Sequence, residues 1–205
     1  MRIQLCLSRD YILKDVLNSK FYHKINDIVL NSGQISTFPD KTKSLSALID
    51  YPYGLGNPSV REHEILSAIR GGATSINLVL NNLLISSDEI GPVLTELNTL
   101  KLICKERKVK LIPIIEYRTL RSYDILDLCP RLYNNGISSI IIGTGTIVDD
   151  ITDNLITCQQ IVSKVGMEVI PCLYFLSSKQ LESFVKIDIK TIRLMSISSV
   201  ENLFR

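Results

Sequence analysis

Short runs of β-branched and aliphatic residues alternate along this chain with longer amphipathic stretches. Continuous apolar runs of this length are typical of strands buried on both faces, as in parallel sheets. The expected strands are IQLCLS (3–8), LSALID (45–50), SINLVLN (75–81), KLIPIIE (110–116), SSIIIG (138–143), MEVIPCLYF (167–175) and TIRLMS (191–196). The two patterns repeat about every 25 to 35 residues, which predicts a series of βα units with right-handed crossovers.

The stretches between these runs carry apolar residues at three- and four-residue spacing, which predicts amphipathic helices. In one of them, NPSVREHEILSAIRGG (57–72), Pro58 lies near the start and a glycine pair at the end, as helix termini favour. The other expected helical stretches are 9–33, 87–108, 121–136, 149–166 and 177–187.

Seven or eight βα units form either a barrel or a doubly wound open sheet. No GxGxxG or GxxxxGK[ST] sequence opens a helix, so the nucleotide-binding open sheets lose support. We therefore favour an α/β fold of the TIM type, a (β/α) barrel.

Composition narrows the class of protein. A chain of 205 residues suits one domain, residues 1–205. A formal net charge of +2 gives no electrostatic case for a nucleic-acid partner. The five cysteines form no CxxC pair, which favours buried free thiols in a reducing compartment. We expect a soluble, cytoplasmic protein without a membrane partner, because no apolar run could span a bilayer and the N-terminus lacks the apolar core of a signal peptide.

Residues 49–81, IDYPYGLGNPSVREHEILSAIRGGATSINLVLN, carry the most specific pattern in the chain. An aromatic-Pro-x-Gly turn (51–54) leads to a helix with Glu64 near its middle, and the helix ends in Gly72-Ala73. The next strand reads Asn-Leu-Val-Leu-Asn (77–81). This pattern resembles the deoxyribose-phosphate aldolase family, whose members are TIM barrels. The resemblance implies a barrel whose ligand is a phosphorylated small molecule.

The resemblance extends more loosely over nearly the whole chain. LCLSRDYI matches the family's strand with a cysteine close to the substrate, at Cys6, and KLIPIIEYRTL matches a strand that ends in a glutamate, at Glu116. TIRLMSISSVENL (191–203) resembles the last strand and helix, where small residues bind phosphate.

The same resemblance implies that the catalytic residues have been lost. The family's Schiff-base lysine leads a Lys-Thr-Ser-Thr-Gly run, and aligning its end with Thr144-Gly145 places Ile141 at the lysine position. The catalytic aspartate falls on Asn77, a second lysine on Ile112 and a third near Pro171-Cys172. Isoleucine cannot form the electron-withdrawing iminium, and asparagine cannot shuttle a proton.

Relocated chemistry would need other residues at the C-terminal ends of the strands, where barrel active sites lie. Lys179 follows the 167–175 strand, although a solvated lysine in the first turn of a helix explains it as well. Glu116 and Arg118 lie at another strand end, where they could bind a polar ligand or form a structural ion pair. The two histidines, His23 and His63, are isolated from each other, so neither a metal nor a cofactor is expected.

Several polar residues are candidates for ligand binding. The turn at Thr144 and Gly145 could offer backbone N–H groups to an anion. Ser196, Ser198 and Ser199 lie at an expected strand–helix junction and suit either phosphate binding or helix capping. The remaining candidates are Cys6, Asn77 and Asn81; for Asn77, a hydrogen bond to a neighbouring polar group is the alternative.

The family's first strand has no counterpart in the expected series. Residues 31–44 could supply a short substitute around QISTF, although they look more like a loop. Without it, a parallel edge beside 3–8 or 191–196 would need cover from 31–44 or from a second subunit, which leaves a homo-oligomer open.

Three functional hypotheses follow. The favoured one is a catalytically degenerate aldolase-like barrel that acts as a binding or structural protein. The alternative is an active lyase or isomerase on phosphorylated sugars that uses Glu116, Arg118 and Lys179. The third is a scaffold without a small-molecule ligand, which an apolar, filled barrel mouth would favour.

Overall fold

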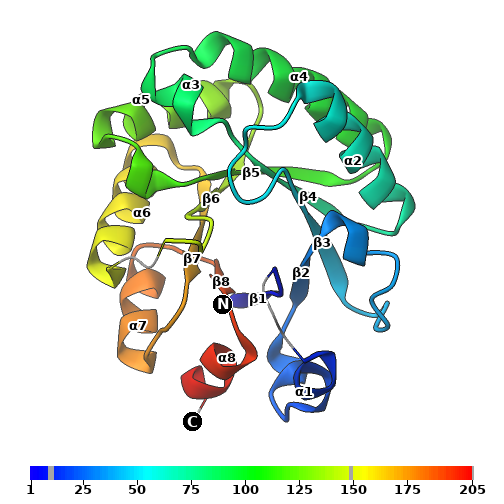
Figure 1. Cartoon of the computed structure of the whole chain (residues 1–205). Helices are drawn as coiled ribbons and strands as arrows, with labels where there is room; N and C mark the ends of the chain where they lie inside the picture. The colour runs from blue at the N-terminus through cyan, green and yellow to red at the C-terminus, as the bar shows by residue number, and fades with distance from the viewer. Residues whose placement is uncertain (9–11, 148–149, 205) are drawn as a thin grey trace.

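Eight parallel strands form a closed barrel in sequential order, and the helices surround it (Figure 1). This computed structural model describes residues 1–8, 12–147 and 150–204. The strands are β1 (Arg2–Cys6), β2 (Asp27–Asn31), β3 (Ser44–Ile49), β4 (Ser75–Val79), β5 (Lys110–Ile115), β6 (Ser139–Ile142), β7 (Glu168–Leu173) and β8 (Thr191–Leu194). The α-helices are α1 (Leu13–Asn18), α2 (Pro58–Arg70), α3 (Asn82–Ser86), α4 (Ile90–Glu106), α5 (Ser122–Asn134), α6 (Ile151–Val165), α7 (Ser178–Lys186) and α8 (Ile197–Leu203). The 3-10 helices within these described ranges are η1 (Tyr22–Lys24), η2 (Ser32–Gln34) and η3 (Tyr117–Thr119).

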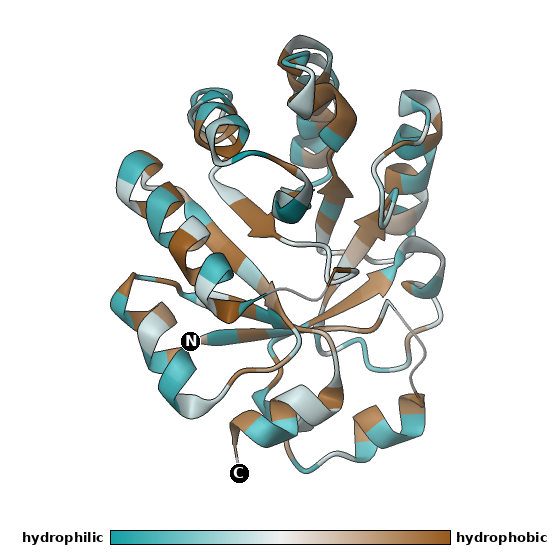
Figure 2. Ribbon diagram, turned by 60° about the vertical axis from the view of Figure 1, so that its left-hand side comes forward, coloured by the Kyte–Doolittle hydropathy of each residue, from teal (hydrophilic) through white to brown (hydrophobic). Residues whose placement is uncertain are grey.

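The TIM-type barrel predicted from the sequence is confirmed, and each of the seven expected strands is present. The β-branched runs form these strands because both faces are buried. In β6, Ile140 and Ile142 pack toward the helices, whereas Ile141 belongs to the cluster inside the barrel. Figure 2 shows the consequence, with largely hydrophobic strands at the centre and hydrophilic residues on the outer faces of the helices.

The expected absence of one strand was wrong. The stretch 9–33, expected to be helical, contains α1, η1 and then β2, which pairs with β1 through Gln4↔Asp27 and with β3 through Asp27↔Ser44. Ile25, Ile28 and Val29 have helical spacing, but all three are buried and the last two lie in the strand. Within 31–44, the segment between Asn31 of β2 and Ser44 of β3 contains η2 and turns rather than a substitute strand.

The barrel therefore has no exposed edge at its closure. β1 and β8 are hydrogen-bonded in register from Arg2↔Thr191 to Leu5↔Leu194. The C-terminal segment also contacts the region before β2, because the rings of Phe21 and Phe204 stack with centroids 5.9 Å apart. The expected cover by residues 31–44 or by a second subunit is not needed.

The five cysteines are buried free thiols, as predicted. Burial raises the pKa of Cys129 to about 12 and that of Cys104 to about 11, so both thiols stay protonated at neutral pH.

Candidate functional site

The C-terminal end of the barrel is covered by the turn at residues 143–146. Gly143 and Gly145 adopt positive φ angles of 90° and 76°, and this bends the chain immediately after β6. Gly145 lies against Met195, and an added Cβ there would be 2.6 Å from the Met195 Sδ and Cε atoms. The turn therefore sits directly on the inner side chains of the barrel.

Glu116, at the end of β5, holds this turn. Its Oε2 accepts hydrogen bonds from the Thr144 backbone N–H at 2.9 Å and from the Thr144 hydroxyl at 2.6 Å. The Glu116 residue is only 8% exposed. Its carboxylate is thus engaged in structure and is not presented to the solvent.

Two tyrosines fix the other side of the turn. The Tyr51 hydroxyl donates to the Thr144 carbonyl at 2.9 Å and accepts from the Ser8 hydroxyl at 3.2 Å. The Cys6 thiol contacts Ser8 at 3.5 Å. Tyr174, which follows β7, donates to the Gly145 carbonyl. Side chains near β1, β3 and β7 thus fasten the turn across the barrel mouth.

An apolar cluster fills the barrel beneath the turn. Its buried members are Cys6, Val29, Leu48, Val79, Ile112, Ile114, Ile141, Ile170, Cys172 and Met195. The cluster includes Ile112 and the fully buried Ile141. These are the two positions at which the sequence resemblance implies lysines. No lysine among the described residues is buried. The members of this cluster thus include no lysine.

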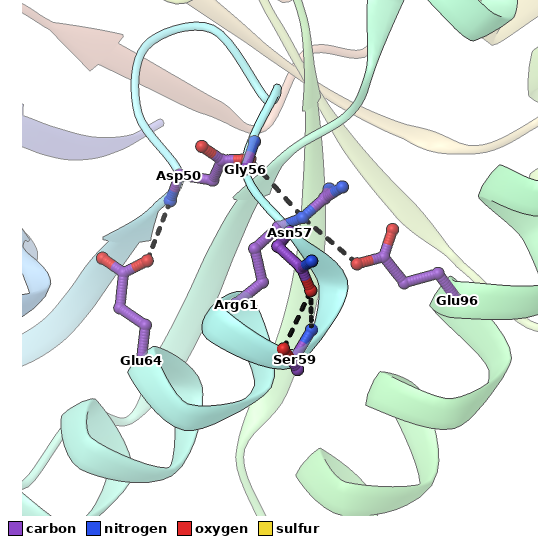
Figure 3. Close-up of polar contacts among 7 residues, drawn as sticks. All are labelled: Asp50, Gly56, Asn57, Ser59, Arg61, Glu64 and Glu96. Atoms are coloured by element: carbon purple, nitrogen blue, oxygen red, sulfur yellow. Dashed lines mark hydrogen bonds and ion pairs between the residues drawn. The ribbon is translucent and has the colours of Figure 1, made fainter.

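The β3–α2 loop, which carries Tyr51, is anchored by charged residues (Figure 3). Arg61 of α2 is 4% exposed, and its Nε lies 3.4 Å from the Asp50 Oδ2 and 3.2 Å from the Glu96 Oε1 of α4. Asp50 has a φ of 52°, and its Oδ2 also accepts from the Gly56 N–H at 2.7 Å. Burial raises the pKa of Glu96 against the opposing charge of Arg61, while the charge of Asp50 raises it further.

Glu64 of α2 supports the start of the same loop. Its Oε2 accepts from the Asp50 N–H at 3.2 Å, and its Oε1 accepts from the Ser32 hydroxyl at 2.6 Å. Glu64, singled out by the sequence resemblance, thus has a structural role.

The candidates for relocated chemistry do not converge. The guanidinium of Arg118 pairs with Asp153 of α6 at 2.7 Å, so no ion pair links Arg118 to Glu116. The Glu116 Oε1 accepts from the Arg118 backbone N–H at 3.4 Å. Lys179 is exposed in the first turn of α7. The catalytic roles considered for these three residues remain predictions.

The candidate ligand-binding residues at the helix starts act as caps. Asn81 caps α3 by accepting from the N–H groups of Leu83 and Leu84. Ser196 caps α8 by accepting from the Ser199 N–H at 3.1 Å, and the Ser199 hydroxyl donates to the Tyr174 carbonyl. Ser198 is exposed on α8. A phosphate role for the serines stays a prediction beside this capping role.

Asn77 belongs to a polar layer in the amino-terminal half of the barrel, which the sequence analysis missed. Arg193 of β8 is 2% exposed and donates to the Asn77 Oδ1 at 2.5 Å and to the Gln4 Oε1 at 2.9 Å. Gln4 donates to the Asp27 Oδ2 at 3.0 Å, and Ser46 donates to the same oxygen at 2.8 Å. Long polar residues inside the apolar runs IQLCLS and TIRLMS were the available signal.

Asp27 is buried, and no cation among the described residues is directly bonded to it. Burial raises its pKa to about 6, against the opposing effects of the Ser46 hydrogen bond and the charges of Arg193 and Arg2. The structure thus places a perturbed carboxyl at the amino-terminal end of the barrel, away from the 143–146 turn.

An open hollow remains at the C-terminal rim. A cavity of about 270 Å³ lies beside the closed mouth, between Tyr53, Leu80, Asn82, Glu116 and Ile147. Within the described part of the chain, no three His, Cys, Asp or Glu residues form a group that could hold a metal ion. No helix in the described ranges is long and apolar enough to cross a membrane.

No family model matches the chain. The curated deoxyribose-phosphate aldolase of Histophilus somni (strain 2336) is 24% identical over 155 residues, which cover 73% of this chain and 68% of that protein. The Treponema denticola enzyme of the same name is 25% identical over 138 residues, covering 65% of this chain and 63% of the relative. The sequence similarity supports membership of a deoxyribose-phosphate aldolase-like family.

Solved structures with aldolase names share this barrel. The structure titled "QR15, an Aldolase" has a TM-score of 0.82 at 20% identity and covers 100% of this chain and 94% of its own. The tetrameric deoxyribose phosphate aldolase from Aeropyrum pernix has a TM-score of 0.80 at 20% identity. The match covers 98% of this chain and 87% of the Aeropyrum pernix chain. At this identity the structural likeness shows the fold alone.

Proposed function

We propose that this chain is an aldolase-like barrel without imine chemistry that serves as a binding or structural protein. The carrying observation is Ile141, fully buried in the apolar cluster at the position that the resemblance assigns to the Schiff-base lysine. Aldol cleavage through an imine needs a primary amine that reaches the substrate carbonyl. Among the described residues, no buried lysine is available to supply one.

The covered mouth supports the same proposal. Four hydrogen bonds join the 143–146 turn to Glu116, which accepts two of them, and to Tyr51 and Tyr174, which each donate one. A sugar phosphate bound on the barrel axis would have to displace this turn. The rim cavity beside Glu116, at about 270 Å³, is the place where a small phosphorylated ligand would fit without that displacement.

An active lyase on phosphorylated sugars is the second candidate. It would use Glu116 and Arg118 with a Lys179 amine that moves to the rim. The contacts of Glu116 with Thr144 and of Arg118 with Asp153 weigh against it. Association into oligomers, described for the tetrameric Aeropyrum pernix relative, is a separate expectation that solution size would test.

Acetaldehyde release from deoxyribose 5-phosphate separates the candidates. We expect no release above a buffer control, either for the native chain or for the Lys179→Gln variant. Release that the Lys179→Gln substitution abolishes would establish the lyase and overturn the proposal.

A further inference from the structure

A second cavity opens at the amino-terminal end of the barrel, opposite the 143–146 turn. It measures about 240 Å³, and seven of the eight strands line it at or beside their first residues. The residues that matter for its chemistry are Arg2, Gln4, Asp27, Ser44, Ser75 and Lys110. The cavity is therefore a mainly polar hollow, whereas at the other end of the barrel the 143–146 turn covers the apolar cluster.

Asp27 provides an unpartnered acceptor in this cavity wall. The residue is 6% exposed, and its Oδ2 accepts from Gln4 and Ser46. Its Oδ1 is buried and has no hydrogen-bond partner among the described residues. A buried carboxylate oxygen without a donor is costly, and a donor entering from this cavity would relieve that cost.

Arg2 provides an unpaired cation at the same cavity. Arg2 and Gln4 are two residues apart on β1 and both line the hollow, and Gln4 is in register with Asp27. The guanidinium of Arg2 forms no ion pair with any residue in the described ranges. The other cation, Lys110, is already paired with Glu168 at 3.0 Å. Glu168 also accepts hydrogen bonds from Ser139 and Thr191. The charged groups of this cavity without an ion-pair partner among the described residues are therefore Arg2 and Asp27.

We propose that this amino-terminal cavity binds a small zwitterion of the α-amino-acid class, with its ammonium on Asp27 and its carboxylate on Arg2. The ammonium supplies the donor and the positive charge that the Asp27 Oδ1 lacks. The carboxylate suits a guanidinium, which binds such groups with two parallel hydrogen bonds. Hydroxyls of Ser44 and Ser75 add polar contacts, and the volume restricts the ligand to amino acids with short side chains. This site is independent of the function proposed above.

Titration of the ¹⁵N-labelled full chain with glycine tests the proposal, with methylammonium and acetate as probes of each half of the zwitterion. We expect saturable shifts of amide resonances at the amino ends of β1 to β5. Asp27→Asn and Arg2→Gln should each weaken glycine binding at least about tenfold, because each removes a charge-assisted hydrogen bond. Methylammonium and acetate should each bind at least about tenfold more weakly than glycine.

Lys190→Gln is the matched control, because Lys190 is a cation at the same end of the barrel, 71% exposed and outside this cavity. It should leave glycine binding unchanged. Arg2 is exposed, so Arg2→Gln keeps the test decisive even if Asp27→Asn fails to fold. The proposal is overturned if glycine causes no saturable shift, as for a cavity that holds only water. It is overturned equally if acetate binds as well as glycine, or if the response persists in Arg2→Gln.

Discussion

The hydroxyl of Tyr51, at the end of β3, donates a 2.9 Å hydrogen bond to the carbonyl oxygen of Thr144, just after β6. Ninety-three residues separate the two along the chain, so the bond joins opposite parts of the barrel mouth. Together with the contacts of Glu116 and Tyr174, it holds the 143–146 turn over the apolar cluster. The barrel mouth in this protein is therefore a packed structure whose parts can be tested one at a time.

Tyr51→Phe should destabilise the fold by about 1 kcal/mol, because it leaves the Thr144 carbonyl and the Ser8 hydroxyl without this partner. Urea unfolding measures the loss, and amide exchange at residues 144–146 should become faster. Tyr53→Phe, on the same loop but 72% exposed, is the control and should leave both unchanged. Equal stability of the two variants would mean that the Tyr51 bond does not hold the turn.

Glu116→Gln should cost about 1–3 kcal/mol, because it replaces the charged acceptor of two Thr144 donors with a neutral amide. Chemical denaturation gives the value. Glu182→Gln, on the exposed face of α7, is the matched charge removal and should change stability little. A Glu116→Gln variant that is as stable as the native chain but binds sugar phosphates poorly would argue for a ligand role instead.

The buried Asp27 should make stability fall as the pH rises. Its folded-state pKa of about 6 lies above the ordinary value of an aspartate, 3.8, so the folded state binds the proton more tightly than the unfolded state. Stability therefore decreases between about pH 4 and 6, by on the order of 3 kcal/mol, and the loss persists above that range. Asp27→Asn removes this titration, so subtracting its stability–pH curve from the native curve isolates the effect. A difference that does not change over this interval would contradict the assignment.

Gly54→Ala should be more destabilising than Gly166→Ala. Both glycines have left-handed backbone angles, with φ of 68° and 71°, so each substitution costs about 1 kcal/mol in strain. At Gly54 a Cβ would also lie 2.4 Å from the Leu80 carbonyl oxygen, whereas at Gly166 it would meet nothing within 4 Å. Thermal melts of the two variants compare the costs, and equal melting temperatures would show that the Gly54 contact relaxes freely.

The sequence allowed the barrel and seven of its strands to be predicted because buried parallel strands leave long apolar runs. β2 was missed because Ile25, Ile28 and Val29 fit a helical period as well as a strand, and only the pairing with β1 and β3 decides between them. The hydrogen bonds between Glu116 and Thr144 also could not be predicted from the sequence. Periodicity places strand ends at one edge but does not specify which side chains meet there. The buried Arg193 was visible as a charge inside an apolar run, but its partners on β1 and β4 depend on the closed register.

The most direct test of the proposed loss of imine chemistry is borohydride trapping. An amine that condenses with the aldehyde of deoxyribose 5-phosphate forms an imine and releases water, and borohydride reduces that imine to a stable secondary amine. We expect the intact mass of the protein to remain unchanged after incubation with both reagents, because the resemblance assigns the lysine positions to Ile141 and Ile112. A single adduct that maps to Lys179 and disappears in Lys179→Gln would contradict the account.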